Sequence, residues 1–524
     1  MAENTRAVGS VTYREAGQGY FEKRQLRRHA AFWSLWALGV GAVISGDFYG
    51  WNLGLDAGGF GGLLIAGIVI TVMYYGLCFS IAEMSPALPH TGGAYSFSRS
   101  AMGPWGGFVT GLAENMEYVI TPAVVVGAMG FLSHDIVFSL TGADGWWNSP
   151  VLWWAVFYIV FVGINILGIE ITMRFTVVIT VLALGILAFF FVAVLVSRAF
   201  HGELLTNIPP EEGGSSFLPK GIVGIFPALP FAIWFYLAIE ELPLAAEESH
   251  DPKRDIPRAT IWGLTTLVLF AVLTLFLNTG VGGGAAAIGT SATPLFDGFK
   301  AVFGEGTGAA ILATVGLIGL IASFFTIIYA YGRNTYSLSR AGYFPQSLSI
   351  THPTRNTPYV ALIVGAVIGY ALSLLIYFLG QSENAIAGKI VGALLYMAVF
   401  GAVISYFMQC LAFIVLRRKL PNIERPYRSP VGVWGAAIAG AIALVALISL
   451  FLNDDYRPGV YGTLVYFIIG IVYFAVRGRH KLVLSPEEEF ALSHGQHGAN
   501  LQEEGYGTVS VSEISADQSP TRSQ

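Results

Sequence analysis

Long apolar segments recur along the whole chain and constrain its fold more than any other feature. Twelve stretches each reach about 20 predominantly apolar residues, the length that a helix needs to cross the hydrocarbon core of a bilayer. Only 12% of the 524 residues are charged, against about 25% in a soluble domain. The sequence therefore predicts an all-α integral membrane protein with 12 transmembrane helices, near residues 32–55, 61–83, 104–132, 151–170, 175–197, 222–246, 259–281, 307–332, 359–379, 389–416, 431–452 and 460–477.

Lysines and arginines are shared unequally between the loops that join these segments. If the N-terminus is cytoplasmic, the inner loops and the adjoining ends hold twenty of them and the outer loops five. Short loops with excess positive charge stay on the cytoplasmic side. We therefore expect a multi-pass protein of the cell membrane with both termini in the cytoplasm.

Composition divides the chain into three parts. Residues 1–30 form a polar, cytoplasmic N-terminal segment, and residues 31–480 form the membrane domain. Residues 481–524 have few large apolar side chains, so we expect a disordered cytoplasmic tail. Cys78 and Cys410 lie within predicted spans, where a structural disulfide is not expected, and no histidine lies in the middle of a span. We expect no metal site and no cofactor.

The first and sixth segments differ from the others because both contain helix-breaking residues and acids. The first has glycines at 39, 41, 46 and 50 around Asp47, and the sixth has prolines at 227, 230 and 243 before and beside Glu240 and Glu241. Interrupted segments in matching positions of two halves indicate a transporter binding site. The pattern predicts a 5+5 repeat, residues 32–197 and 222–416, with extra helices at 431–477. The odd number of spans per repeat makes the second repeat inverted.

Five motifs follow one another in an order that resembles a known superfamily. They are GVGAVISG at 39–46, EMSPALPHTGGAY at 83–95, EESHDPKRDIPRA at 247–259, RNTYSLSRAGYFP at 333–345 and RPY at 425–427. Together they resemble the amino acid–polyamine–organocation superfamily. Within it, GDFYGWN at 46–52, SRSAMGPWGGF at 98–108 and TGLAENMEY at 110–118 look most like ethanolamine permeases.

This resemblance implies the leucine-transporter-like fold, with a substrate site between spans one and six, flanked by spans three and eight. It also implies that backbone groups around Ile44, Ser45 and Gly46 bind substrate. Asp47 departs from the usual small or apolar residue at its position. Two like charges about 4 Å apart repel by about 4 kcal/mol at an effective dielectric of 20, so Asp47 disfavours a substrate with its own carboxylate. It favours an amine such as ethanolamine, unless Asp47 caps a half-helix or lies at the aqueous end of its span.

Glu114 and Glu117 lie three residues apart and therefore face one side of the third span, together with Tyr118. We expect these residues to line the pathway, bind an ammonium or exchange a proton. The alternative is a structural hydrogen-bond network with Asn115 and neighbouring helices. Glu241, Glu247 and Glu248 are expected to approach the cytoplasm and to pair with Lys253, Arg254 or Arg258 there.

Aromatic and polar side chains near the sixth break and in the eighth span complete the candidate site. The resemblance implies that Trp234 closes over the substrate, and Phe235 and Tyr236 beside it are candidates for cation–π contact; lipid or core packing is the alternative. Glu240 occupies a position where the superfamily often has an acid. Its two candidate roles are coupling of transport and structural bracing of the helices. Ser323 and Thr326 are candidate gating or coupling hydroxyls, or bond within their own helix. The fifth span has no lysine near Ala183, which argues against the lysine-based proton coupling of some relatives.

These observations predict potential-driven or secondary active uptake of a small amine, most simply ethanolamine, by alternating access. An amino acid permease of the same superfamily is the alternative. The expected partners are the small-molecule substrate, the lipid bilayer, and a proton or an exchanged solute, with no nucleic acid. A membrane enzyme acting on an amine or lipid headgroup is disfavoured, since the sequence has no phosphate-binding Walker loop and no H-E-x-x-H motif.

Overall fold

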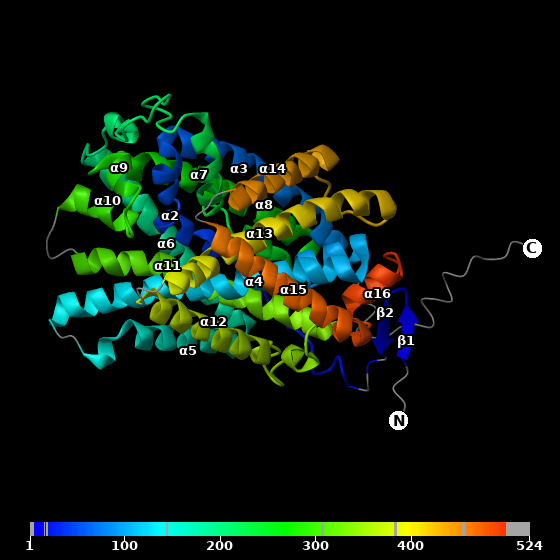
Figure 1. Cartoon of the computed structure of the whole chain (residues 1–524). Helices are drawn as coiled ribbons and strands as arrows, with labels where there is room; N and C mark the ends of the chain where they lie inside the picture. Colours follow the sequence, from blue (N-terminus) through cyan, green and yellow to red (C-terminus); the bar gives the residue numbers. More distant parts are fainter. Residues whose placement is uncertain are drawn as a thin grey trace, which may run out of the picture.

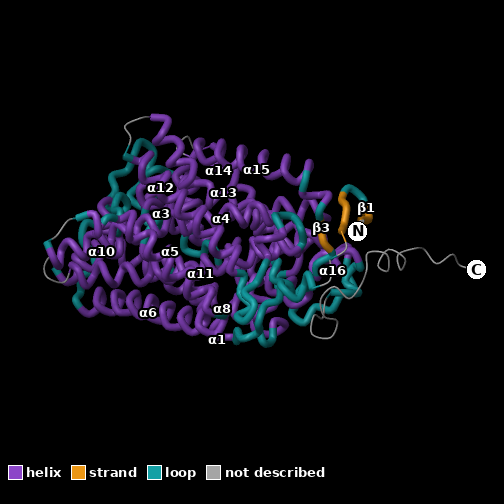
Figure 2. Tube along the Cα trace, turned by 90° about the horizontal axis from the view of Figure 1, so that it is seen from below, coloured by secondary structure: helices purple, strands orange, loops and turns teal. Residues whose placement is uncertain are grey.

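The computed structural model describes residues 5–14, 16, 19–142, 145–304, 309–381, 385–452 and 456–498. They form an elongated bundle of helices, with β1 and α16 at one end and α10 near the other (Figure 1). We call the end that carries β1 and α16 the terminal end. Turning the molecule by 90° keeps β1, β3 and α16 together at that end (Figure 2).

Within the described residues, ten helices are long and apolar enough to cross a membrane. They are α3 (Leu53–Ala87), α4 (Gly93–Thr141), α5 (Pro150–Leu167), α6 (Ile169–Val196), α8 (Pro252–Thr279), α11 (Ala309–Arg340), α12 (Tyr359–Gly380), α13 (Ala385–Lys419), α14 (Gly432–Leu452) and α15 (Arg457–Val476). Two shorter apolar segments, Phe32–Phe48 and Ile222–Ile233, bring the total to the twelve that the sequence predicts. The predicted all-α membrane fold is confirmed.

Two glycines explain why α3 and α4 are longer than the predicted second and third spans. Gly59 (φ +73°) and Gly103 (φ +80°) each interrupt the helical backbone. A residue with a side chain adopts such positive φ angles only with strain. The straight parts of α3 and α4 therefore begin after these glycines, close to the predicted starts at residues 61 and 104.

The first and sixth spans are both interrupted, as predicted. The first consists of α1 (Phe32–Val43) and α2 (Ser45–Phe48), after which Tyr49 is extended. The sixth consists of α7 (Ile225–Ile233), a turn over residues 234–238, and the 3₁₀ helix η4 (Ile239–Glu248). Ala238 has φ +82°, a left-handed conformation that is uncommon for a residue with a Cβ. Glycine and proline weaken or remove intrahelical bonding, so these sequences do not continue as one helix.

Helix contacts place the interrupted spans inside the bundle. α1 packs against α6, α8 and α11, while η4 contacts α1, α4, α8 and α11. α4 in turn packs extensively against α11 and α13. The first, third, sixth and eighth spans are therefore neighbours around one central region.

Several short elements connect or flank the spans. The loop between α8 and α11 contains α9 (Gly284–Ile288) and α10 (Pro294–Phe303), which were not predicted from the sequence. Short 3₁₀ turns of the described residues are η1 (Trp146–Asn148), η2 (Gly202–Thr206), η5 (Gln346–Ser349) and η7 (Gly478–His480), while η3 (Ile222–Gly224) begins the sixth span.

The beginning of the C-terminal tail is folded, which corrects the expectation of disorder from residue 481. β1 (Thr5–Val8) pairs antiparallel with β2 (Val11–Arg14), and β2 pairs parallel with β3 (Leu482–Val483). The helix α16 (Pro486–Leu492) follows. Leu482 and Phe490 are buried, and the acids of α16 meet arginines of the bundle, so this segment gains contacts that its composition does not reveal. Residues 499–524 of the expected tail lie outside the described residues.

Candidate functional site

The two helix breaks touch each other through their backbones. A Cβ atom added to Gly46 would lie 1.9 Å from the Trp234 carbonyl oxygen, so no larger residue fits there. The Gly50 Cα faces the Trp234 ring, which an added Cβ would meet at 3.4 Å. This contact gives a physical reason for the glycines of the first break.

The eighth span holds the first break through one hydroxyl. The backbone N–H of Ser45 donates to Ser323 Oγ at 3.0 Å, and Ser323 Oγ donates to the Gly41 carbonyl at 3.0 Å. Thr326 instead donates to Ala322 and Ser323 carbonyls of its own helix. Of the two predicted hydroxyls, only Ser323 therefore bonds across to the break. The Ile44 side chain packs in an apolar cluster that includes Ala183 of α6.

Asp47 is fully buried, and neither carboxylate oxygen has a hydrogen bond within the described residues. The Thr274 hydroxyl of α8 lies beside this carboxylate, near enough for a weak hydrogen bond, but the two groups do not reach ordinary hydrogen-bond geometry. The two alternatives for Asp47 receive no support, because its carboxylate neither caps a half-helix nor reaches an aqueous surface. A buried carboxylate without a partner is costly, and a bound cation or a proton removes that cost.

Three other acids lie near Tyr118, on α4 and η4. The Tyr118 hydroxyl lies 3.2 Å from Glu240 Oε1 and 3.5 Å from Glu114 Oε1. Glu117 is 1% exposed, and both of its oxygens lack hydrogen bonds within the described residues. We call Glu114, Glu117, Tyr118 and Glu240 the acid cluster. None of the ion pairs among the described residues involves these acids, so protons or a cation must balance their charge.

Asn115 does not bond to Glu114 or Glu117, whereas Tyr118 links Glu114 to Glu240 of η4 and so forms the part of the alternative network that involves a neighbouring element. Its amide nitrogen donates to Thr335 Oγ1 at 3.0 Å, and its amide oxygen accepts from the Tyr466 hydroxyl at 3.4 Å. Asn115 therefore braces α4 against α11 and α15. Glu114 and Glu117 face η4 instead.

The three aromatic residues of the sixth break have different surroundings. Trp234 is half-buried and its ring lies 6.0 Å from that of Tyr49. Phe235 stacks on Trp51 at 5.6 Å between ring centroids. The Tyr236 hydroxyl is 2.8 Å from Thr71 Oγ1. Only Trp234 keeps an accessible ring surface, whereas Phe235 and Tyr236 pack in the core, the alternative considered for them.

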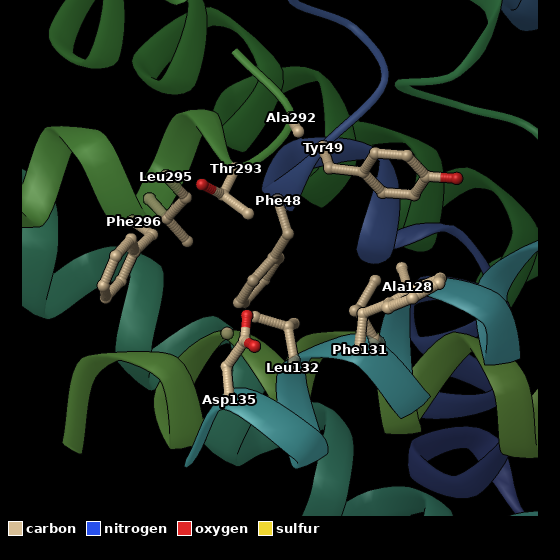
Figure 3. A pocket seen from close by; sticks show the side chains of 12 residues that line it. Phe48, Tyr49, Ala128, Phe131, Leu132, Asp135, Ala292, Thr293, Leu295 and Phe296 are labelled. Carbon is tan, nitrogen blue, oxygen red and sulfur yellow. The ribbon is translucent and has the colours of Figure 1, made fainter. Parts of the chain in front are cut away.

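A cavity of about 330 Å³ opens beside the first break, among the side chains drawn in Figure 3. Two of its lining residues belong to α10, which lies near the end of the bundle opposite the terminal end (Figure 1). Side chains of the first break, α4, α10 and α11 line the cavity, and Asp135 of α4 is the one carboxylate among them. Three lining residues, Phe48, Tyr49 and Asp135, were not predicted as site residues from the sequence. A signal was present for Asp135: it follows Glu117 by 18 residues, about five helical turns at 3.6 residues per turn, and so shares its face of α4.

The acids near the terminal end are ion-paired, but not with the expected residues. Arg333 Nε and Nη2 each lie 2.9 Å from an oxygen of Glu248. Arg340 Nη2 lies 2.6 Å from Glu247 Oε1. The expected partners were Lys253, Arg254 and Arg258, and this expectation was wrong for Glu247 and Glu248, since Arg340 and Arg333 bind them and Lys253 bonds to Glu424. Glu241 is buried and forms no ion pair among the described residues. Two arginines of α11 thus bind η4, the second part of the sixth span.

The sequence also matches characterised protein families. The family model described as "Amino acid permease" matches residues 31–474. The chain belongs to this amino acid permease family. It is therefore a multi-pass membrane transporter, and the family is one that carries small solutes of the amino acid type.

Its relatives resemble it over most of their length. An uncharacterized transporter of Rhizobium meliloti is 29% identical, covering 86% of this chain and 91% of the relative. A branched-chain amino acid permease of Bacillus subtilis is 26% identical, covering 87% and 95%. A methylthioribose transporter of Bacillus subtilis is 27% identical, covering 88% and 96%. The names of these relatives cover more than one class of solute.

Proposed function

We propose that this permease carries a small amine, with ethanolamine as the first candidate, into the cytoplasm by alternating access. The observation that supports this proposal is the Asp47 carboxylate, which is fully buried at the first break with both oxygens unbonded within the described residues. An ammonium group is the ligand whose charge and donors such a carboxylate requires. The protein then supplies the negative charge that an amino acid would bring itself.

Backbone carbonyl groups at the two breaks also favour a positively charged ligand beside this carboxylate. Carbonyl groups at an interrupted helix end carry partial negative charge, which favours a cation. The half-buried Trp234 ring lies against the same break, at a position where cation–π attraction contributes about 0.5–2 kcal/mol. Trp234 is therefore the proposed cover over the bound amine.

The cavity beside Phe48 and Tyr49 is the proposed entrance. If both termini are cytoplasmic, the cavity faces the outside, and Asp135 there attracts a cation (Figure 3). The membrane potential favours entry of one positive charge by about 2.3 kcal/mol per 100 mV. Uniport of the ammonium form therefore suffices for accumulation, and the acid cluster is the proposed place for a coupled proton or an exchanged solute.

A permease for amino acids is the second candidate, favoured by the relative named a branched-chain amino acid permease. Backbone N–H groups of the first break would then bind the substrate carboxylate. Asp47 would have to stay protonated in that case, because its charge would repel the carboxylate.

Uptake by proteoliposomes separates the two candidates. Purified protein is reconstituted, an inside-negative potential is imposed, and labelled ethanolamine is added with an excess of unlabelled ethanolamine, alanine, valine or methylthioribose. We expect uptake that unlabelled ethanolamine abolishes and that valine leaves unchanged. Valine uptake together with no competition by ethanolamine would establish the amino acid permease instead.

A further inference from the structure

Three consecutive glutamates of α16, Glu487, Glu488 and Glu489, are almost completely buried at the terminal end. Acidic side chains are normally exposed to solvent, since burying a charge is costly unless it is paired and hydrogen-bonded. We call residues 482–498 the C-terminal strap. The ion pairs of Glu487 and Glu488 account for the burial of their charges.

Glu487 binds the end of the eighth span. Its Oε1 accepts hydrogen bonds from Arg340 Nη2 at 2.6 Å and from Ser337 Oγ at 2.8 Å. The same Arg340 binds Glu247 of η4. One guanidinium therefore joins the eighth span, the second part of the sixth span and the strap.

Glu487 remains ionised while it makes this contact. Burial raises the pKa of the Glu487 carboxyl, but the Arg340 guanidinium outweighs burial and holds that pKa at about 2, below its ordinary value of 4.5. A carboxyl whose pKa is lower in the folded state stabilises that state fully above its ordinary pKa. The stabilisation is lost progressively as the pH falls from 4.5 to about 2, so it is fully present at neutral pH.

Glu488 binds the start of α4 and the N-terminal hairpin. Its Oε2 accepts hydrogen bonds from Arg99 Nε at 2.6 Å and from the Tyr13 hydroxyl at 2.5 Å. Its Oε1 accepts from the hydroxyls of Tyr95 at 3.0 Å and Tyr343 at 2.8 Å. Four donors from three segments of the chain thus converge on one carboxylate.

Apolar and backbone contacts extend the strap across further helices. Phe490 packs in a cluster with Leu88, which follows α3, and with Phe413 of α13. The Val483 backbone N–H donates to the Ala341 carbonyl at 2.9 Å. A Cβ on Gly342 would lie 2.2 Å from the Lys481 carbonyl oxygen, so the chain entering the strap passes directly over this glycine.

The segments bound by the strap are also bound to each other at this end. The backbone N–H groups of His29 and Ala30, just before α1, both donate to the Glu248 carbonyl at 2.8 Å. α1, η4 and the end of α11 therefore form one closed assembly. In alternating access, the cytoplasmic ends of the interrupted helices must move relative to the third and eighth spans.

From this geometry we propose that the C-terminal strap is an intramolecular clamp that holds the terminal end of the transporter closed and must loosen before that end opens. Its docking site is the pair Arg99 and Arg340 with the surrounding tyrosine hydroxyls. The proposal does not depend on which solute is carried, since it concerns the equilibrium between closed and open states. A contact present only in the closed state favours that state by its full binding free energy.

Thiol labelling tests the clamp without any substrate. Cys78 and Cys410, both buried, are replaced by alanine, and Ala245→Cys places one thiol in η4, where the native side chain is buried. Protein in nanodiscs is treated with a membrane-impermeant maleimide. We compare the full chain, a chain that ends after Lys481, and a control chain that ends after Leu501. We expect about tenfold faster labelling, or more, only in the chain that ends after Lys481, since loss of closed-state contacts raises the open fraction.

Two further variants keep the test decisive if the shortened chain is not recovered. Glu487→Gln with Glu488→Gln removes the charges of the clamp, and Glu203→Gln with Glu212→Gln removes two exposed acids elsewhere as a matched control. We expect faster labelling from the first pair alone.

With the shortened chain in hand, adding the strap back as a peptide is a further test. A synthetic peptide of residues 482–498 should slow labelling of the shortened chain again, and the peptide with both glutamines should not. Equal labelling rates with and without the strap charges would overturn the proposal, whatever uptake experiments give.

Discussion

Two groups of buried acids in this transporter differ in what surrounds them. Near the terminal end, five carboxylates bind arginine: Glu83, Glu247, Glu248, Glu487 and Glu488. In the first break, α4 and the start of η4, five acids form no ion pair among the described residues: Asp47, Glu114, Glu117, Glu240 and Glu241. Both groups are almost inaccessible to solvent. The difference therefore lies in their partners and not in their burial.

This comparison separates structural from ligand-binding acids. In a buried ion pair the two charges compensate each other, and removing one partner leaves an uncompensated charge. The charge of a buried acid without a cation is not compensated by the protein, so the acid needs a proton or a ligand from outside. We therefore assign the paired acids to closing the terminal end and the unpaired acids to the transported amine or a coupled proton.

The largest expected effect concerns stability. Glu248→Gln leaves Arg333 buried without its carboxylate, which costs about 3–5 kcal/mol for a broken buried pair. Thermal unfolding in detergent measures this loss. Lys253→Gln, which removes an exposed pair with Glu424, serves as the control and should cost at most about 1 kcal/mol. Equal melting temperatures of the two variants would remove the distinction between paired and unpaired acids.

Asp47→Asn should abolish uptake while the protein keeps its stability, whereas Glu248→Gln should mainly lower stability. Truncating one partner of a buried charge pair costs about 2–5 kcal/mol, so uptake at low amine concentration should fall by about 30-fold or more. The melting temperature should stay the same or rise, because an unpaired buried charge is removed. Uptake at the wild-type rate would show that Asp47 has no part in substrate binding.

A smaller effect is expected in the acid cluster. Glu117→Gln fixes one member of the cluster in a neutral form, so the rate of uptake should depend less on pH than in the wild type. Ala183→Ser, a buried position in α6 outside the cluster, is the control. Uptake is measured from pH 5 to pH 8 at constant potential. Superimposable pH profiles of both variants would exclude the third span from proton coupling.

The smallest expected effect is at Ser323. Ser323→Ala removes the hydroxyl that joins α11 to Ser45 and Gly41 of the first break. A neutral hydrogen bond contributes about 1 kcal/mol, so the apparent affinity for substrate should weaken by about fivefold. Thr326→Val, whose hydroxyl bonds only within its own helix, should change the affinity less.

Local features of the fold were predictable from the sequence, and long-range pairings were not. The lengths of the apolar segments predicted all twelve spans, and their glycines and prolines predicted both breaks. Each of these features lies within a single segment, so it can be recognised without knowing how the helices pack. The spacing of Glu114 and Glu117 correctly placed both toward one neighbour. Their contact with Tyr118 and Glu240, however, depends on how η4 packs against α4.

The ion pairs show the same limit. Lys253 and Arg258 are nearer in sequence to Glu248, yet Arg333 binds it, because α11 runs beside η4. The composition of the tail predicted disorder, and its first residues are folded because distant arginines compensate their acids. A single sequence carries no signal for a partner that lies on another helix.

The most direct test compares the binding of two small molecules that differ in charge. Glycine resembles ethanolamine but carries a carboxylate in place of the alcohol carbon and hydroxyl. Each is titrated by calorimetry into the purified wild-type protein and into Asp47→Asn at neutral pH. The account predicts that the wild type binds ethanolamine and not glycine, and that Asp47→Asn loses ethanolamine binding. Tight glycine binding by the wild type, or ethanolamine binding that Asp47→Asn leaves intact, would contradict it.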